Sequence, residues 1–546
     1  MRKVLIAAVV IALSGCTNLP TGGPVQVGGP LNAPDETQVQ YLASGPVAGA
    51  TQQEILDGYL AAGAAAQDDY RVARLFLTDD FAAEWNPLQE SVIRGAGSSS
   101  SSVGLATMSY STSVLARVTR GGYYALEDAG ASQSFEFEFE EINGEWRIAQ
   151  APDAVFVTAA TFESVYQPFT VFFYNQSRTQ LVPDVRYFPR AGDPATEVAR
   201  AVIGGPSEYL PHAATAFPST ATLVASPVEI SEGRALVDVS RDILDSSADD
   251  QQAMLSQMTS SLDAISGVST VSLTVDRSIV NITGGRSPDV VAEPLVNENA
   301  LIIRDGELGF ALGATVDPLG RLGDRIVDLK PTSVSYHDTG VAAVGTSQGV
   351  YFVGDSQVRV SEQRSAIEPQ IDGNNSVWWV SQRDTSSIRV YSSGRSIEVP
   401  GPWGAKGTIR AVEVSREDAR LAVAVDTAGG PRLYVASISR DNKGRVDSVS
   451  GFHRLPLNGT SVIDIAWADG TNIAAITRKG AGYYVELASV GGVTTSMGQP
   501  TMPASIVGGN GQSELLIRTT DGELWQPRAG GWQSIGLTAD VLATQH

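Results

Sequence analysis

The chain has 546 residues, more than a single hydrophobic core usually supports, so three domains are expected. Its composition, 42% apolar and 18% charged, is that of a globular protein, and no apolar stretch after residue 15 is long enough to span a membrane. The net charge of −22 and the lack of any run rich in lysine and arginine argue against a nucleic-acid partner.

The first fifteen residues have the three-part layout of a secretory signal peptide. Two basic residues precede an apolar run over 4–13, which is too short for a membrane-spanning helix, and small residues then lead to Cys16. Cys16 is the only cysteine, so it cannot form an internal disulfide, and no second thiol exists for a metal or redox pair. The stretch Leu13-Ser14-Gly15-Cys16 resembles a bacterial lipobox, which implies cleavage between Gly15 and Cys16 and a lipid on the thiol. The mature protein is therefore expected to be lipid-anchored at the extracytoplasmic face of the cell membrane.

Residues 16–50 are rich in Gly, Pro, Thr and Gln and are predicted to form a lipidated, flexible tether. A capping-box pattern at Thr51 and Glu54 then predicts the start of a helix.

Residues 51–160 are predicted to form an α+β domain. A second helix is followed by the serine run 98–102, which looks disordered, and by a strand expected over 103–118. The clearest strand covers 134–142, where three phenylalanines alternate with three glutamates before an Asn-Gly turn. Two helices packed on a curved antiparallel sheet resemble the NTF2-like fold, and the row of glutamates is expected to face solvent.

Residues 165–290 are predicted to form a second α+β domain. A helix is expected to begin at Asp193-Pro194, where an N-cap precedes a proline in the first turn, and to end at Gly204-Gly205-Pro206. A second helix is expected over 249–265. The element order, the helix end and the segment 235–240 resemble the GerMN domain of spore-germination proteins, which implies a binding domain rather than a catalytic one.

Residues 293–546 are predicted to form an all-β propeller. An apolar strand, a short turn and a second strand recur, with first strands near residues 300, 341, 377, 421, 473 and 515. A repeat of about 40–45 residues made only of strands is typical of one four-stranded blade. Six blades are predicted, while five and seven stay open because weak outer strands are easily miscounted. The segment 537–543 is expected to close the ring as the innermost strand of the blade that begins at Ala300.

The sequence motifs of catalytic and metal-binding sites do not predict such a site in this chain. The stretch 345–349 matches the nucleophile-elbow pattern GxSxG, but strands are predicted on both sides of it, so a hairpin turn is favoured. The turn 441–444 lacks the closing glutamate of a calcium loop. None of the histidines stands in a metal-ligand spacing; they are His212, His337, His453 and His546. No catalytic residue, cofactor or metal ligand is predicted.

Tryptophans in the propeller offer a weaker possibility. Trp378, Trp379 and Trp403 are candidates for a ligand platform, but packing inside the blades is the preferred interpretation.

Lipobox, tether, NTF2-like domain, GerMN domain and propeller, in this order, resemble the LpqB family of actinobacterial lipoproteins over essentially the whole chain. The resemblance implies an accessory lipoprotein of the MtrA–MtrB two-component system. Such a protein would contact the extracellular domain of the sensor histidine kinase MtrB and affect cell-wall homeostasis and division. One modification is implied, at Cys16, as S-diacylglycerol and N-palmitoyl cysteine, and no motif marks kinase-contact residues. Alternatives are an extracytoplasmic glycan- or peptide-binding module and, less favoured, a propeller hydrolase.

The first prediction concerns the anchor. Cys16→Ser is expected to release the protein from the membrane fraction, because the acyl chains contribute about 0.8 kcal/mol per buried methylene and no other membrane anchor is predicted. Fractionation in high salt measures this, and a variant that still sediments with membranes would contradict the assignment.

Overall fold

The structure, a computed structural model, describes residues 43–546 except 128–131, 285–289 and 365. Residues 42–546 belong to one compact unit. The predicted signal peptide, Gly15, Cys16 and the tether up to residue 42 lie outside the described residues. Within the described ranges, no helix combines the length and the apolar character needed to cross a membrane.

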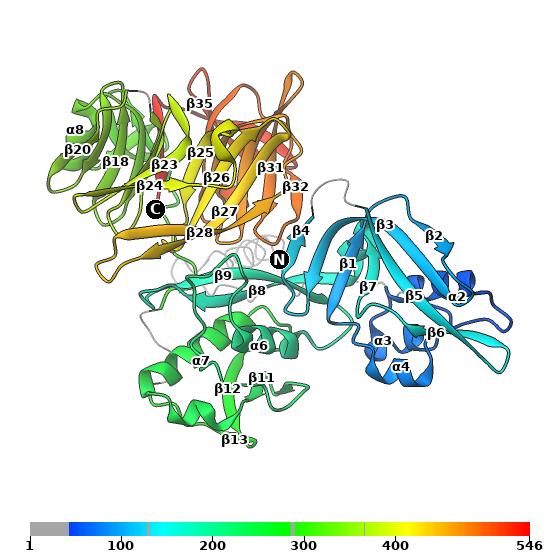
Figure 1. Ribbon diagram of the computed structural model, residues 1–546. Helices are drawn as coiled ribbons and strands as arrows, with labels where there is room; N and C mark the ends of the chain where they lie inside the picture. The colour runs from blue at the N-terminus through cyan, green and yellow to red at the C-terminus, as the bar shows by residue number, and fades with distance from the viewer. Residues whose placement is uncertain (1–42, 128–131, 285–289, 365) are drawn as a thin grey trace, which may run out of the picture. The chain divides into compact units, whose positions relative to one another are not determined.

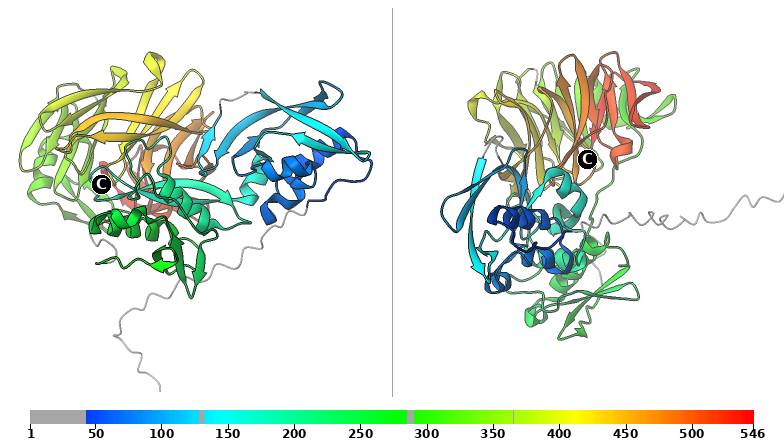
Figure 2. Two further views of the ribbon diagram at one scale, coloured as in Figure 1. Left: turned by 60° about the horizontal axis from the view of Figure 1, so that its bottom comes forward. Right: turned by 90° about the vertical axis from the view of Figure 1, so that its right-hand side faces the viewer.

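The N-terminal domain packs short helices on a mixed sheet, in which β1 and β7 pair in parallel and the other pairings are antiparallel. The helices are α2 (Gln52–Ala62), α3 (Gln67–Arg74), α4 (Asp79–Glu84) and α5 (Ala159–Val165). The strands are β1 (Glu90–Arg94), β2 (Ser99–Ser102), β3 (Thr107–Thr119), β4 (Tyr124–Leu126), β5 (Ser132–Ile142), β6 (Glu145–Gln150) and β7 (Val155–Thr158). They form one sheet in the order β6-β5-β3-β1-β7, with β2 and β4 also pairing with β3. Helices α2 to α4, in blue, lie together beside the cyan sheet (Figures 1 and 2).

Three predictions made from short sequence patterns in this domain are confirmed: a helix cap, an alternating strand and a tight turn. Thr51 and Glu54 form the complete capping box at the start of α2. The three phenylalanines of β5 are buried while the glutamates between them are exposed. Asn143 and Gly144 adopt positive φ angles of 54° and 82° in the β5–β6 turn. The NTF2-like resemblance itself stays a prediction.

The expectation for the serine run was wrong. Ser99–Ser102 form strand β2, which pairs with β3, because a neighbouring strand supplies partners for backbone groups whatever the side chains are. The strand expected over 103–118 therefore begins only at Thr107, and residues 103–106 form the hairpin tip between β2 and β3.

The middle domain places two helices between a hairpin and a small sheet. Its elements are β8 (Tyr166–Tyr174), β9 (Leu181–Pro189), α6 (Pro194–Gly204), β10 (Glu229–Ser231), β11 (Arg234–Asp238), a 3-10 helix (Arg241–Asp245), α7 (Ala248–Leu262), β12 (Thr270–Val275) and β13 (Ser278–Ile279). Strands β8 and β9 pair with each other, and the other strands form a sheet in the order β10-β11-β12-β13. The Asp193 side chain caps α6 with Pro194 at its first turn, as predicted.

The C-terminal domain is a propeller of four-stranded blades. Its first half comprises β14 (Leu301–Arg304), β15 (Glu307–Leu312), β16 (Thr315–Pro318), α8 (Arg321–Asp328), β17 (Pro331–His337), β18 (Val341–Thr346), β19 (Gly349–Val353), β20 (Gln357–Ser361), β21 (Ala366–Ile371), β22 (Val377–Ser381), β23 (Asp384–Ser392) and β24 (Arg395–Pro400). The second half comprises β25 (Thr408–Val414), β26 (Arg420–Thr427), β27 (Gly430–Arg440), β28 (Val446–Leu455), β29 (Ser461–Trp467), β30 (Asn472–Lys479), β31 (Gly482–Ser489), β32 (Thr494–Ser496), β33 (Pro503–Val507), β34 (Leu516–Thr519), β35 (Glu523–Arg528), β36 (Gly531–Thr538) and β37 (Val541–Gln545). Short 3-10 helices cover Gly404–Lys406 and Gln512–Glu514.

The propeller has six blades, as predicted. Four are separate four-stranded sheets, and an eight-stranded sheet contains the other two, β16-β15-β14-β37 and β17-β18-β19-β20. The expectation of an all-β domain was wrong at one point, because helix α8 lies between the first two blades and buries Ile326 completely.

The repeating apolar strands are the second strands of the blades. The predicted starts at 341, 377, 421, 473 and 515 fall on β18, β22, β26, β30 and β34 to within one residue. These strands are buried on both faces, so their sequences are almost continuously apolar. The first strands of the blades carry more polar side chains, so the repeat of apolar strands did not predict them.

Three side-chain hydrogen bonds link first strands of neighbouring blades. In each, a polar side chain accepts the backbone N–H of the following blade's first strand. The contacts are Ile371 N to Ser335 Oγ (3.1 Å), Trp467 N to Glu413 Oε2 (2.6 Å) and Ile506 N to Asp464 Oδ2 (2.8 Å). Burial raises the pKa of Glu413 to about 8 and also raises the pKa of Asp464.

The ring is closed by its C-terminal strand. Leu301, Ile302 and Ile303 of β14 pair antiparallel with Ala543, Leu542 and Val541 of β37. The predicted closure is thus confirmed, with the strand at 541–545, because Leu537 and Thr538 belong to the outer strand β36 of the sixth blade.

Truncation after Asp540 is therefore expected to lower the melting temperature of the ectodomain and to promote aggregation, since it leaves the backbone edge of β14 unpaired. Thermal unfolding with light scattering measures both effects. Asp540→Ala is the control, because Asp540 is exposed and its side chain should be dispensable. A truncated protein that melts like the full chain would contradict the closure.

Candidate functional site

The most elaborate polar site lies where turns of the propeller meet the turn between β8 and β9. A cavity of about 600 Å³ opens there. Its walls come from the β8–β9 turn at 175–177, from the β21–β22 turn, from the β25–β26 turn and from the β27–β28 turn. Each of these turns connects two strands, and side chains from several turns can meet at such an end of a sheet.

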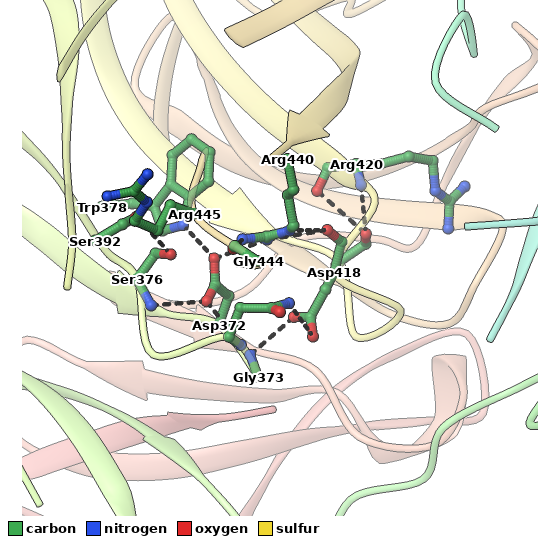
Figure 3. Close-up of polar contacts among 12 residues, drawn as sticks. Asp372, Gly373, Ser376, Trp378, Ser392, Asp418, Arg420, Arg440, Gly444 and Arg445 are labelled. Carbon is green, nitrogen blue, oxygen red and sulfur yellow. Dashed lines mark hydrogen bonds and ion pairs between the residues drawn. The ribbon is translucent and has the colours of Figure 1, made fainter. Parts of the chain in front are cut away.

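Asp372, directly after β21, is the centre of this site (Figure 3). Its carboxylate is completely buried and accepts four hydrogen bonds. The donors are Asn374 N (3.0 Å), Ser376 N (2.8 Å), Trp378 Nε1 (2.8 Å) and Arg440 (2.8 Å). A buried charge is tolerated when it is paired and hydrogen-bonded in this way.

Arg440, the last residue of β27, joins the turns to one another. Its guanidinium pairs with Asp372 and also donates to the backbone carbonyls of Asp418 (3.0 Å) and Gly444 (3.2 Å). Its backbone N–H donates to Oε1 of Gln176 in the β8–β9 turn (2.6 Å). One residue therefore ties three propeller turns to the middle domain.

Asp418 stands in the β25–β26 turn at a φ of 61°, a conformation that Asp tolerates better than most residues. Its Oδ1 accepts the N–H of Gly373 at 2.9 Å. A Cβ atom on Gly373 would come within 2.4 Å of Oδ2, so the close approach of the two turns requires glycine. Burial, followed by the charge of Asp372, raises the pKa of Asp418 to about 7.

The cavity is polar, and its formal charges cancel when Asp418 is ionised. Asp418 and Asp441 supply two carboxylates, and Arg440 and Lys443 supply two cations. Burial lowers the pKa of His212, so this side chain adds no charge at neutral pH. Carboxamides supply further donors and acceptors; they are Asn175, Gln176, Asn374 and Asn442. Such a lining suits a neutral ligand with hydroxyl or amide groups better than an ion.

The predicted nucleophile elbow is a hairpin turn, because β18 precedes it and β19 follows it. The turn 441–444 lies between β27 and β28, where it lines the cavity. The tryptophans pack inside the blades and are at most 8% exposed; they are Trp378, Trp379 and Trp403.

Each histidine has a hydrogen-bond partner of its own. They bond to four separate partners: His212 to Ser450, His337 to Thr339, His453 to Tyr123 and His546 to Gln370. Across the described part of the chain, no cluster of three histidine, cysteine or acidic side chains has the arrangement of a metal site.

Sequence reasoning missed Asp372, Asp418, Arg440 and Gln176. The available signal was the Asp-Gly-Asn-Asn stretch that begins at Asp372 immediately after a strand, since Asp and Asn in turns bond to backbone N–H groups. Nothing in the local sequence shows that this turn meets turns some 45 and 70 residues further along the chain.

Three family models match the chain in succession. The "Lipoprotein LpqB, N-terminal domain" model matches residues 45–163, "Sporulation and spore germination" matches residues 170–278, and "Lipoprotein LpqB beta-propeller domain" matches residues 306–540.

Similar curated proteins span nearly the same length. A protein named "Lipoprotein LpqB" from Cutibacterium acnes is 24% identical and covers 98% of this chain and 99% of its own. A protein of the same name from Thermobifida fusca is 22% identical and covers 97% of this chain and 98% of its own. Among solved structures, the first GerMN domain of the sporulation protein GerM from Bacillus subtilis covers 23% of this chain and 97% of its own, at 21% identity and a TM-score of 0.19.

The buried ion pair gives the third prediction. Asp372→Asn is expected to destabilise the protein by about 3–5 kcal/mol, because it leaves the Arg440 charge buried without its partner. Adding Arg440→Met should cost less than the sum of the single changes. Denaturant unfolding measures both.

The matched control is an exposed pair, Arg395 and Asp447, whose side chains are 46% and 59% exposed. Asp447→Asn should change stability by less than about 0.5 kcal/mol. Equal losses at Asp372 and Asp447 would show that the buried pair has no special role.

Proposed function

This chain belongs to the LpqB family of lipoproteins and is an extracytoplasmic, membrane-associated lipoprotein; from that membership we propose that it is an accessory protein of the MtrA–MtrB two-component system. In this proposal it is anchored through Cys16, binds the extracellular domain of the sensor kinase MtrB, and so affects cell-wall homeostasis and division. It acts by binding and not by catalysis.

A binding role is supported by the cavity at the junction of the middle domain and the propeller. Its charged groups are used mainly in holding turns together, with Asp372 and Arg440 saturated by protein contacts. A catalytic carboxylate pair or nucleophile needs a group free to exchange a proton or attack a substrate. Of the lining carboxylates, Asp418 is the one with a raised pKa, and its Oδ1 already accepts the N–H of Gly373.

A second candidate function rests on the same cavity. Its cancelling charges and its four carboxamides favour a neutral saccharide as ligand, and Oδ2 of Asp418 has only a long contact, 3.4 Å to Asn374. In this alternative the protein is an extracytoplasmic glycan-binding module whose occupancy is sensed by a partner.

The fourth prediction separates these functions by calorimetry on the Cys16→Ser protein. Titration with the MtrB extracellular domain is expected to give saturable heat. Titration with di-N-acetylchitobiose tests the alternative, which requires heat that is lost in the Asp418→Asn, Gln176→Ala double variant and kept in Glu398→Gln, an exposed carboxylate control.

The outcomes are distinct. Heat with the kinase domain and none with the sugar supports the accessory function alone. Heat with the sugar alone supports the glycan-binding module, and cleavage of the sugar would indicate a hydrolase. A folded protein that gives no heat with either titrant would overturn both proposals.

A further inference from the structure

The hairpin tip between β2 and β3, residues 103–106, presents apolar side chains to solvent. Leu105 is 97% exposed, more than any other large apolar side chain among the described residues, and Val103 is 64% exposed. Isolated exposed leucines are common on protein surfaces, so exposure by itself carries little meaning. Three further observations distinguish this tip.

The backbone of the tip is held firmly although its side chains are uncovered. Val103 N donates to Thr107 O at 2.9 Å, closing the turn. The Leu105 carbonyl accepts a hydrogen bond from Gln52 Nε2 at 2.9 Å, and the Ala106 carbonyl accepts one from Phe139 N at 2.7 Å. Leu105 is therefore held outward by contacts from both α2 and β5, and it cannot fold back onto the domain without breaking them.

The tip lies in an uncharged stretch of a strongly acidic chain. No charged residue occurs from Gly95 to Ala116, although charged residues make up 18% of the sequence and the net charge is −22. The nearest row of carboxylates is on β5, where Glu138 pairs in register with Thr107. The tip itself can thus approach a lipid surface without desolvating a charge, while the flanking glutamates oppose close contact with anionic headgroups.

The tip also contacts the start of α2, the first helix of the domain. Gln52, which contacts Leu105, is the first residue of α2, and Gln53 accepts a hydrogen bond from Ser100 of β2 at 2.7 Å. The residues that precede α2 lead back toward the predicted lipid site at Cys16. The tip therefore lies beside the first helix that follows the predicted anchoring segment in the sequence.

We propose that this tip is a second membrane contact, in which Val103 and Leu105 insert into the interfacial layer of the bilayer that holds the lipid anchor. Removal of these side chains from water favours insertion, and the anchor keeps the tip near the surface at high effective concentration. The fixed backbone means that little conformational entropy is lost when the side chains enter lipid. The contact orients the N-terminal domain on the membrane, independently of any kinase partner.

The fifth prediction uses the lipidated full chain reconstituted in phosphatidylcholine vesicles. Cys16 is the only cysteine and its thiol is occupied by lipid, so Leu105→Cys introduces one thiol for an environment-sensitive fluorophore. Emission from this probe is expected to shift to shorter wavelength and to be quenched by lipids that carry a nitroxide near the headgroup. Adding Val103→Ser should weaken the insertion by roughly tenfold, the effect of exposing one apolar side chain.

Leu312→Cys is the matched control, because Leu312 is an exposed leucine at a hairpin end of the propeller. A shift and quenching at position 105 but not at 312 support the proposal. Equal emission at both positions overturns it. A shift that grows with protein concentration at constant lipid, or that requires the added kinase domain, also overturns it, because a second copy or a protein partner then covers the tip.

Labelling stoichiometry checks the anchor separately. Wild-type protein should take up no fluorophore, and the Leu105→Cys protein one per chain. Labelling of the wild type would count against the lipid at Cys16, whereas the insertion measurement tests the tip. Replacing phosphatidylcholine by phosphatidylglycerol should reduce the shift, since Glu138 and its neighbours on β5 are repelled by anionic lipid.

Discussion

The ring of six blades is closed by one strand pairing, that of β14 with β37. The first blade takes one strand from the far end of the domain, so none of the propeller is complete until residues 541–545 are in place. The same strand also makes a short parallel pairing with β17 of the second blade, through Ser335 and Tyr336. The C-terminus thus supports two blades at once, and the positions of all turns around the ring depend on it.

The ring brings together turns that lie far apart along the chain, and buried polar groups then fix them. Asp372 and Arg440 illustrate this role, because the ion pair between them joins two neighbouring blades. A buried ion pair contributes little net stability compared with apolar packing, but it penalises any arrangement in which one charge lacks its partner. The side-chain hydrogen bonds between first strands also fix neighbouring blades to one another, because each satisfies a backbone N–H of the next blade.

The middle domain is joined to the propeller by both polar and apolar contacts. Arg420 is completely buried, pairs with Glu417, donates to the carbonyl of Pro183 at 3.3 Å and lies over the Trp467 ring at 4.6 Å. A single apolar cluster includes Val185 of β9, Ala424 of β26 and Ile473 of β30. Polar and apolar contacts thus hold the middle domain against the propeller.

The sequence by itself determined the features that depend on local chemistry. The capping box at Thr51, the alternation in β5, the Asn-Gly turn and the apolar second strands of the blades all follow from neighbours within a few residues, and each is present in the structure. The order of domains and the number of blades follow from the same patterns. The lipobox around Cys16 is equally local, although it lies outside the described residues.

Only the tertiary structure decided which residues meet. Serine side chains do not indicate a strand, yet β2 forms because β3 offers partners for its backbone. The first strands of the blades escaped the apolar pattern because their polar side chains find partners on the next blade. Asp372, Asp418 and Arg440 look like ordinary turn and strand-end residues, and they converge because two neighbouring blades stack on one another. Long-range contacts of this kind depend on how the blades stack, which the short-range spacing of side chains does not specify.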